Sequence, residues 1–222
     1  MPAKNSIKNY VESGYYNIYN RGVEKRVIFL DEQDYGVFLS YLKEYLSPKD
    51  EQDLRERLSD ASISSRDKDK ILKSLRLNNF NEEIVLLAYC LMPNHFHFFV
   101  KQRSPGSIDK FMNSLGTRYT MYFNRKYSRV GSLYQGVYKA VFITTEAQFL
   151  HLSRYIHRQA IAQQNQPCSY PEYLGLRKTP WVHHAEILSF FSKTIPSLSY
   201  QGFVEDEEVD SSALLRNLTL EM

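Results

Sequence analysis

Two histidines and a tyrosine–glutamine pair are the side chains in this sequence whose types and spacing suit chemistry at a common site. His95 and His97 alternate in the run HFHFFV at 95–100, and alternate residues of a β-strand point to the same face of a sheet. Two neighbouring imidazoles can bind one divalent cation. Alternating histidines are also often half-exposed polar residues on an open sheet. The pair alone therefore leaves a metal site and a plain polar surface both open.

Tyr155 and Gln159 lie four residues apart in ITTEAQFLHLSRYIHRQAI. A helix presents residues at this spacing on one face, with His151 one turn earlier. A tyrosine that projects toward a histidine pair would supply a nucleophile, and the carboxamide would supply a third metal ligand. Because the chain has 17 tyrosines, a packing role is the simpler explanation for any one of them. The chemistry thus depends on whether the fold brings this helix face to the histidines.

The elements that would position these residues follow a regular order. β-favouring residues indicate strands, and helical spacing of apolar residues indicates helices. The predicted strands cover 15–19, 84–91, 95–100 and 138–143, and the predicted helices cover 31–46, 108–126 and 145–163. This order predicts an α+β fold, a ferredoxin-like split βαβ antiparallel sheet with helices on one face. The other face would be free to hold a site.

Three segments fall outside that pattern. We expect a main domain over 1–165 with a charged helical insertion at 49–82, a C-terminal extension over 166–200 and an acidic, flexible tail over 201–222. The tail contains six acidic residues and one arginine, so it carries −5 and leaves +8 on residues 1–200. A basic body suits a polyanionic partner, but an ordinary solvated surface explains the charge equally well.

Composition limits the other classes of protein. Cys90 and Cys168 are the two cysteines, which give neither a disulfide framework nor a thiolate zinc site, so a metal would need nitrogen and oxygen ligands. No apolar run approaches the roughly 18 residues that span a bilayer, and MPAKNSIKNY at the start lacks the apolar core of a signal peptide. We therefore expect a cytoplasmic protein with no membrane partner.

Two motifs carry a resemblance to a known family. MPNHFHFFV at 92–100 and RYIHRQ at 154–159 resemble the histidine strand and the catalytic helix of the single-tyrosine HUH transposases. The resemblance includes YNRG at 19–22 and RYTMYFNRKYSRVGSLYQGVYKA at 118–140, and it is strongest to the REP-associated, IS200-like branch. It implies an enzyme that cuts and rejoins single-stranded or hairpin DNA, as a monomer or homodimer.

The resemblance also implies a role for each candidate residue. His95, His97 and Gln159 would bind Mg²⁺ or Mn²⁺. Tyr155 would be the nucleophile and form a 5′-phosphotyrosine intermediate, with His151 as a candidate proton acceptor. Cationic side chains interleaved with aromatic ones suit single-stranded DNA, and those expected to contact it are Arg21, Arg118, Arg125, Lys126, Arg129 and Lys139.

Two other functions fit parts of the same pattern. A non-catalytic DNA-binding regulator on the same fold would not need His95, His97 and Tyr155 together. A metal-dependent hydrolase that activates water would usually add carboxylate ligands, and neither motif contains one. The acidic tail could also shield a basic DNA groove until DNA displaces it.

Overall fold

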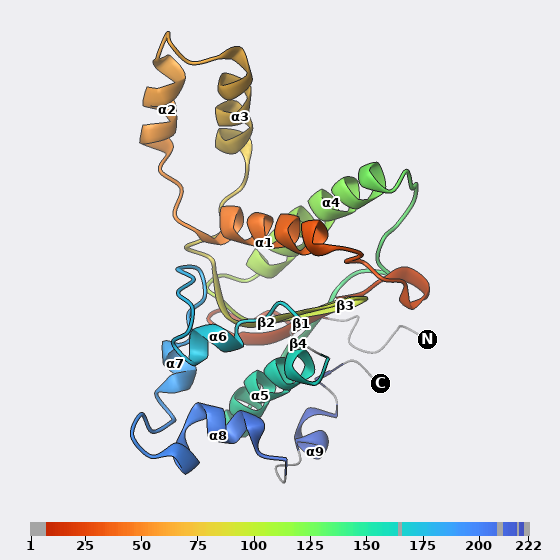
Figure 1. Ribbon diagram of the computed structural model, residues 1–222, viewed down its shortest axis with the longest axis vertical. Helices are drawn as coiled ribbons and strands as arrows, with labels where there is room; N and C mark the ends of the chain where they lie inside the picture. Colours follow the sequence, from red (N-terminus) through yellow and green to blue (C-terminus); the bar gives the residue numbers. More distant parts are fainter. Residues whose placement is uncertain (1–7, 164–165, 208–210, 217, 220–222) are drawn as a thin grey trace.

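A four-stranded antiparallel sheet forms the centre of the molecule (Figure 1). The computed structural model describes residues 8–163, 166–207, 211–216 and 218–219. The strands are β1 (Tyr15–Arg21), β2 (Ile84–Met92), β3 (His95–Gln102) and β4 (Lys139–Phe142). Their spatial order is β2-β3-β1-β4, which is the order of a ferredoxin-like split βαβ sheet. The predicted fold class is therefore confirmed.

The three long helices predicted from apolar spacing begin and end within one residue of the expected positions. The helices are α1 (Glu32–Leu46), α2 (Glu51–Ser59), α3 (Ser65–Arg76), α4 (Ser107–Lys126), α5 (Glu146–Ala162), α6 (Tyr170–Tyr173), α7 (Ala185–Leu188), α8 (Tyr200–Glu205) and α9 (Ser212–Leu215), with 3₁₀ turns at Val23–Lys25 and Pro196–Leu198. Within the described ranges, no helix is long and apolar enough to cross a membrane.

One face of the sheet packs against α1 and α4 (Figure 1). Phe38 of α1 and Phe111 of α4 are fully buried there, together with Phe98 of β3. Burial of such aromatic side chains is the main stabilising contribution of this layer. Phe96 and Phe98 of β3 therefore point away from the face that carries the histidines.

The other face of the sheet is covered by α5, so the expectation of helices on one face only is wrong (Figure 1). Leu152 and Ile156 of α5 pack with Ala88 of β2 and Phe99 of β3 in a second buried cluster. The reason lies in β2, whose residues are apolar on both sides and almost all buried. A strand of this composition requires a cover on each face. The histidines consequently lie between the sheet and a helix.

The predicted insertion forms the pair α2 and α3, which projects away from the sheet (Figure 1). No residue of α2 is buried, and Ile71 is the buried residue of α3. At its base, Lys49 Nζ donates to the carbonyl oxygens of Leu75 and Leu77 at 3.2 and 2.9 Å. These contacts hold the two ends of the insertion together beside α1.

The C-terminal part of the chain packs along β2 and α5. The Leu91 amide donates to the Pro167 carbonyl at 2.9 Å, which places the extension beside the edge of β2. Val204, Leu215 and Leu218 are buried against the α5 cluster. The expectation of a flexible tail over 201–222 is therefore wrong for these residues, because the tail supplies apolar side chains to the core. Residues 208–210, 217 and 220–222 lie outside the described residues.

Candidate active site

The two histidines lie side by side on the face of β3 that α5 covers. Their ring centroids are 5.3 Å apart with the rings perpendicular. His97 is fully buried, whereas His95 is half-buried near the start of the strand. Strand alternation accounts for this placement, because Phe96 and Phe98 occupy the opposite face.

The helix residues reach these imidazoles from α5. The centroid of the Tyr155 ring lies 5.4 Å from that of His97, at 89°. One turn further, Gln159 Oε1 lies 3.1 Å from His95 Nε2. The fold thus brings together four residues that are up to 64 positions apart in the chain. All four come from one copy of the chain.

Burial controls the protonation of both imidazoles. It lowers the pKa of His97 well below the usual value, and the nearby charges of His95 and Arg21 act in the same direction. Burial likewise lowers the pKa of His95, with Gln159 opposing and Arg21 reinforcing the shift. Both rings are therefore neutral at neutral pH, which is the form that binds a metal ion.

Tyr155 is covered by the C-terminal segment. Burial raises the pKa of its hydroxyl to about 12, an effect partly offset by Thr219 and Gln159 beside it. The backbone carbonyl of Leu218 accepts a hydrogen bond from Asn17 Nδ2 at 2.5 Å, which fixes this segment to β1. The phenol is consequently protonated at neutral pH and lies beneath residues close to the end of the chain.

Two of the six predicted DNA-contacting cations lie on the histidine face. Arg21 pairs with His95 across β1 and β3, and Lys139 pairs with Tyr19 across β1 and β4. The Arg21 Nε is buried with no hydrogen-bond partner in the described part of the chain. A Cβ atom on the next residue, Gly22, would lie 2.3 Å from the Arg26 carbonyl oxygen. Glycine in the YNRG motif therefore allows the turn that ends β1 beside Arg21.

The other four predicted cations belong to α4 and the turn after it, which pack on the opposite side of the sheet. Arg118 forms an ion pair with Glu44 at 2.8 Å, and Lys126 forms ion pairs with Asp31 and Asp34. Arg129 donates to Asn124 at 3.0 Å, and Arg125 is exposed. The structure does not bring these four side chains to the histidines.

His151 lies one turn before Tyr155, as predicted, but its described contacts are elsewhere. Its Nδ1 is 2.8 Å from Ser211 Oγ, and its ring packs edge-on against Phe203. Burial lowers the pKa of His151, as does the charge of Arg154. These contacts connect His151 to the segment around α8 and α9 and not to the Tyr155 hydroxyl.

Two residues of the site were missed by the sequence analysis, Asn17 and Asn94. Asn17 Oδ1 lies 3.5 Å from His97 Nδ1, and Asn94 Oδ1 lies 2.7 Å from His95 Nδ1. A signal existed for the first, because Asn17 interrupts the β-favouring run YYNIYN and is fully buried. Asn94 lies in the turn between β2 and β3, where asparagine is common for conformational reasons alone.

The residues at this site fit a small divalent cation. His97 Nε2 and Gln159 Nε2 are buried with no hydrogen-bond partner among the described residues. His95 Nε2 and Gln159 Oε1 are 3.1 Å apart, close to the roughly 3.0 Å that separates adjacent ligands of an octahedral ion with bonds of about 2.1 Å. Within the described ranges, no group of three or more His, Cys, Asp or Glu side chains could hold a metal. A site here would use two imidazoles and a carboxamide.

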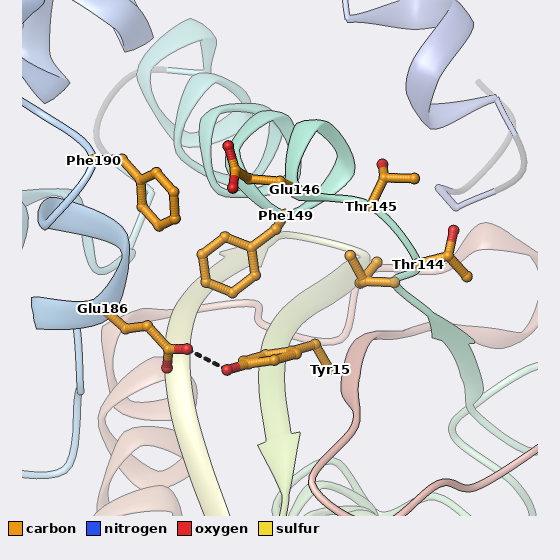
Figure 2. A pocket seen from close by; sticks show the side chains of 8 residues that line it. Tyr15, Thr144, Thr145, Glu146, Phe149, Glu186 and Phe190 are labelled. Carbon is orange, nitrogen blue, oxygen red and sulfur yellow. Dashed lines mark hydrogen bonds between the residues drawn. The ribbon is translucent and has the colours of Figure 1, made fainter.

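Two of the pockets in the described part of the chain lie close to the sheet but outside this cluster. One, of about 600 Å³, lies between α4 and the turn at 132–138 and reaches Asn20 at the end of β1. The other, of about 240 Å³, is lined by Tyr15, Phe149 and Glu186 at the start of α5 (Figure 2). Tyr15 donates a hydrogen bond to Glu186 there. Neither pocket includes the two histidines, Tyr155 or Gln159.

Comparisons with known proteins find similarity to transposases. The family model described as "Transposase IS200 like" matches residues 55–159. No curated protein matches the sequence. A solved REP-associated tyrosine transposase bound to a REP hairpin is 8% identical with a TM-score of 0.49, covering 81% of this chain and 97% of that chain. A candidate transposase from Deinococcus radiodurans R1 is 14% identical with a TM-score of 0.36, covering 69% and 96%.

The range matched by the family model covers the candidate site. It contains the histidine strand β3 and the helix α5 as far as Gln159, so it includes all four clustered residues. It also contains α4 and β4, whereas β1 and α1 lie outside it. Over residues 55–159, the chain is similar to the IS200-like transposases.

Proposed function

We propose that this protein is a metal-dependent endonuclease and strand transferase for single-stranded DNA, with Tyr155 as the nucleophile. The observation that carries the proposal is the convergence of Tyr155 and Gln159 of α5 on the imidazoles of β3. The similarity to IS200-like transposases suggests the class of reaction. The arrangement of side chains in the structure suggests which residues perform the reaction.

His95, His97 and Gln159 would hold Mg²⁺ or Mn²⁺. Such an ion, when bound, acts as a Lewis acid on the scissile phosphate and orients it. The chain itself supplies neutral imidazoles, which burial maintains, and a carboxamide oxygen 3.1 Å from His95 Nε2. The amide oxygen suits both ions, whereas Mg²⁺ prefers oxygen to imidazole nitrogen, so Mn²⁺ is the better match to this set of ligands.

Tyr155 would perform the covalent step. Its oxygen forms a bond to phosphorus while the bond from phosphorus to the 3′ oxygen breaks; the phenol proton passes to solvent, and the 3′ oxygen takes up a proton. The products are a 5′-phosphotyrosine and a free 3′-hydroxyl. Reversal with another 3′-hydroxyl rejoins DNA without a nucleotide cofactor, because the phosphotyrosine keeps the energy of the phosphodiester.

Unpaired DNA, alone or next to a hairpin, is the substrate that this site favours. The Tyr155 hydroxyl lies between the sheet and α5, so a flexible strand can approach it more easily than a duplex. Arg21 and Lys139 provide positive charge on the same face, which suits a phosphate backbone.

A denaturing gel with oligonucleotides labelled at either end tests the proposal. With Mn²⁺, the wild-type protein is expected to form a covalent adduct with the 3′-end label, and Tyr155→Phe and His97→Gln are expected to form none. Tyr15→Phe is the matched control, since Tyr15 lies on the same sheet face but lines the distant pocket (Figure 2). Binding without any adduct would favour the non-catalytic regulator. Cleavage that survives Tyr155→Phe would favour attack by water.

A further inference from the structure

The Nδ1 atoms of the two imidazoles both face a side-chain amide of an asparagine. Asn94 Oδ1 is 2.7 Å from His95 Nδ1, and Asn17 Oδ1 is 3.5 Å from His97 Nδ1. The asparagines come from different elements, the turn between β2 and β3 and the strand β1. Each imidazole therefore has its own amide neighbour on the side away from Gln159.

The orientation of the Asn94 amide is fixed by a second contact. Its Nδ2 donates to the Lys25 carbonyl oxygen at 3.2 Å. Turning the amide over would place Oδ1 against that carbonyl, so that two acceptors would face each other without a proton. The oxygen of Asn94 must therefore face His95. Only a protonated Nδ1 can donate to it.

A second contact also fixes the orientation of the Asn17 amide, and this contact lies in the protein interior. It is fully buried, and its Nδ2 donates to the Leu218 carbonyl oxygen at 2.5 Å. Its oxygen consequently faces His97 Nδ1, where the longer separation describes a weaker hydrogen bond. A buried amide oxygen without a donor is costly, which favours the His97 tautomer that places a proton on Nδ1.

In a neutral imidazole, a proton on Nδ1 leaves a lone pair on Nε2. His97 Nε2 has no hydrogen-bond partner in the described part of the chain, and His95 Nε2 faces Gln159 Oε1 at 3.1 Å. In this tautomer, His95 Nε2 and Gln159 Oε1 are both acceptors. A cation between them would satisfy both, which a hydrogen bond cannot do.

We propose that Asn17 and Asn94 are positioning residues that hold both imidazoles in the Nδ1–H tautomer, so that both Nε2 lone pairs point to one cation position beside Gln159. This inference rests on the proposed function. It adds the residues that prepare the site before a metal arrives. Partners of this kind around metal-binding histidines commonly change metal affinity by about 10- to 100-fold.

The direct test uses the wild-type protein without metal or DNA. Long-range ¹H–¹⁵N correlation spectra of the histidine rings, recorded in chelator at neutral pH and assigned with His95→Gln and His97→Gln, report which ring nitrogen carries the proton. Protons on Nδ1 of both His95 and His97 are expected. A proton on Nε2 of either ring would overturn the proposal for that histidine.

Variants test the effect on metal binding by titration calorimetry with Mn²⁺. Asn94→Leu, at a half-buried turn position, and Asn17→Leu are expected to weaken Mn²⁺ binding by about 10- to 100-fold. Asn20→Leu is the control, since Asn20 is buried in β1 but donates to Gly136 on the other face. Wild-type affinity in Asn94→Leu, or equal losses in all three variants, would contradict the proposal.

The same measurements distinguish failure of the proposed function from failure of the proposal about the asparagines. If the wild-type protein shows both Nδ1–H tautomers but binds no Mn²⁺, the tautomer assignment is supported and the metal-dependent function fails. If Mn²⁺ binds and the tautomers differ from those expected, the function is retained and the role of the asparagines is rejected.

Discussion

At the scale of single residues, the buried imidazoles determine the pH range over which a cation can bind. Protons and the cation compete for the same nitrogen atoms, and a free histidine has a pKa of about 6.5. Burial lowers the pKa of His95 and His97, so protons compete only at lower pH. We expect the Mn²⁺ affinity to change by less than about twofold between roughly pH 8 and pH 6.5 and to fall below that range.

Calorimetric titration with Mn²⁺ at several pH values measures this dependence. A loss of affinity of about threefold or more on going from pH 7.5 to pH 6.5 would mean that the two rings titrate like exposed histidines, and the buried site described above would be incorrect.

The candidate site itself was largely predictable at this scale. The spacing of two in a strand and four in a helix places His95 with His97, and Tyr155 with Gln159, on shared faces. Asn17 and Asn94 were not predicted, because their roles depend on partners in other elements. No local pattern connects Asn17 to His97 across 80 positions of sequence, or to a carbonyl near the end of the chain.

At the scale of elements, Lys126 joins α4 to the start of α1. Its Nζ lies 2.7 Å from Asp31 and 2.8 Å from Asp34. Burial alone would raise the pKa of Asp34, but Lys126 and neighbouring hydrogen bonds hold it below its usual value. Lys126→Met would leave the buried Asp34 carboxylate without its cation. We expect the Tm to fall by at least about 2–4 °C, the shift that 1 kcal/mol gives in a chain of this size.

Thermal unfolding monitored by circular dichroism measures that effect, with Arg125→Met as the control because Arg125 is exposed on the same helix. The sequence pattern suggested a DNA contact for Lys126. An unchanged Tm in Lys126→Met together with weaker binding of single-stranded DNA would support that earlier interpretation against the structural one.

The sequence predicted where helices and strands begin and end better than it predicted which face of the sheet each helix covers. Apolar spacing in α5 shows that one side of the helix is buried, but it does not say which face of the sheet covers it. The continuous apolar run of β2 was the available signal for a second layer. The packing of α9 was not predictable in the same way, because a four-residue helix has too little periodicity to reveal a buried face.

At the scale of the whole molecule, the acidic tail of the chain lies at the candidate site on the basic main domain. The chain carries its positive charge over residues 1–200 and an excess of negative charge in the tail. Part of this tail lies over Tyr155, where Leu215 and Leu218 are buried and Thr219 is beside the hydroxyl. A substrate that reaches the tyrosine must therefore displace this segment. Displacing the segment costs the free energy of burying Leu215 and Leu218, and a chain that lacks the segment would not have this cost.

Deletion of residues 211–222 is expected to increase the rate at which the 3′-labelled strand becomes attached to Tyr155. Burial of one leucine stabilises the covered arrangement by up to about 1.5–3 kcal/mol, so a gain of up to about 10- to 100-fold is expected. The measurement is the initial rate of adduct formation in Mn²⁺ over a series of salt concentrations. Because the cover is apolar, the gain should persist at high salt, where charge effects are screened.

The double variant Glu207→Gln and Glu208→Gln is the matched control, since it removes negative charge from the tail and keeps Leu215 and Leu218. It should change the salt dependence of DNA affinity without reproducing the gain in rate. A truncated chain that reacts at the wild-type rate would show that the segment is displaced without cost. A gain that disappears at high salt and is reproduced by the double variant would instead assign the effect to the charge of the tail.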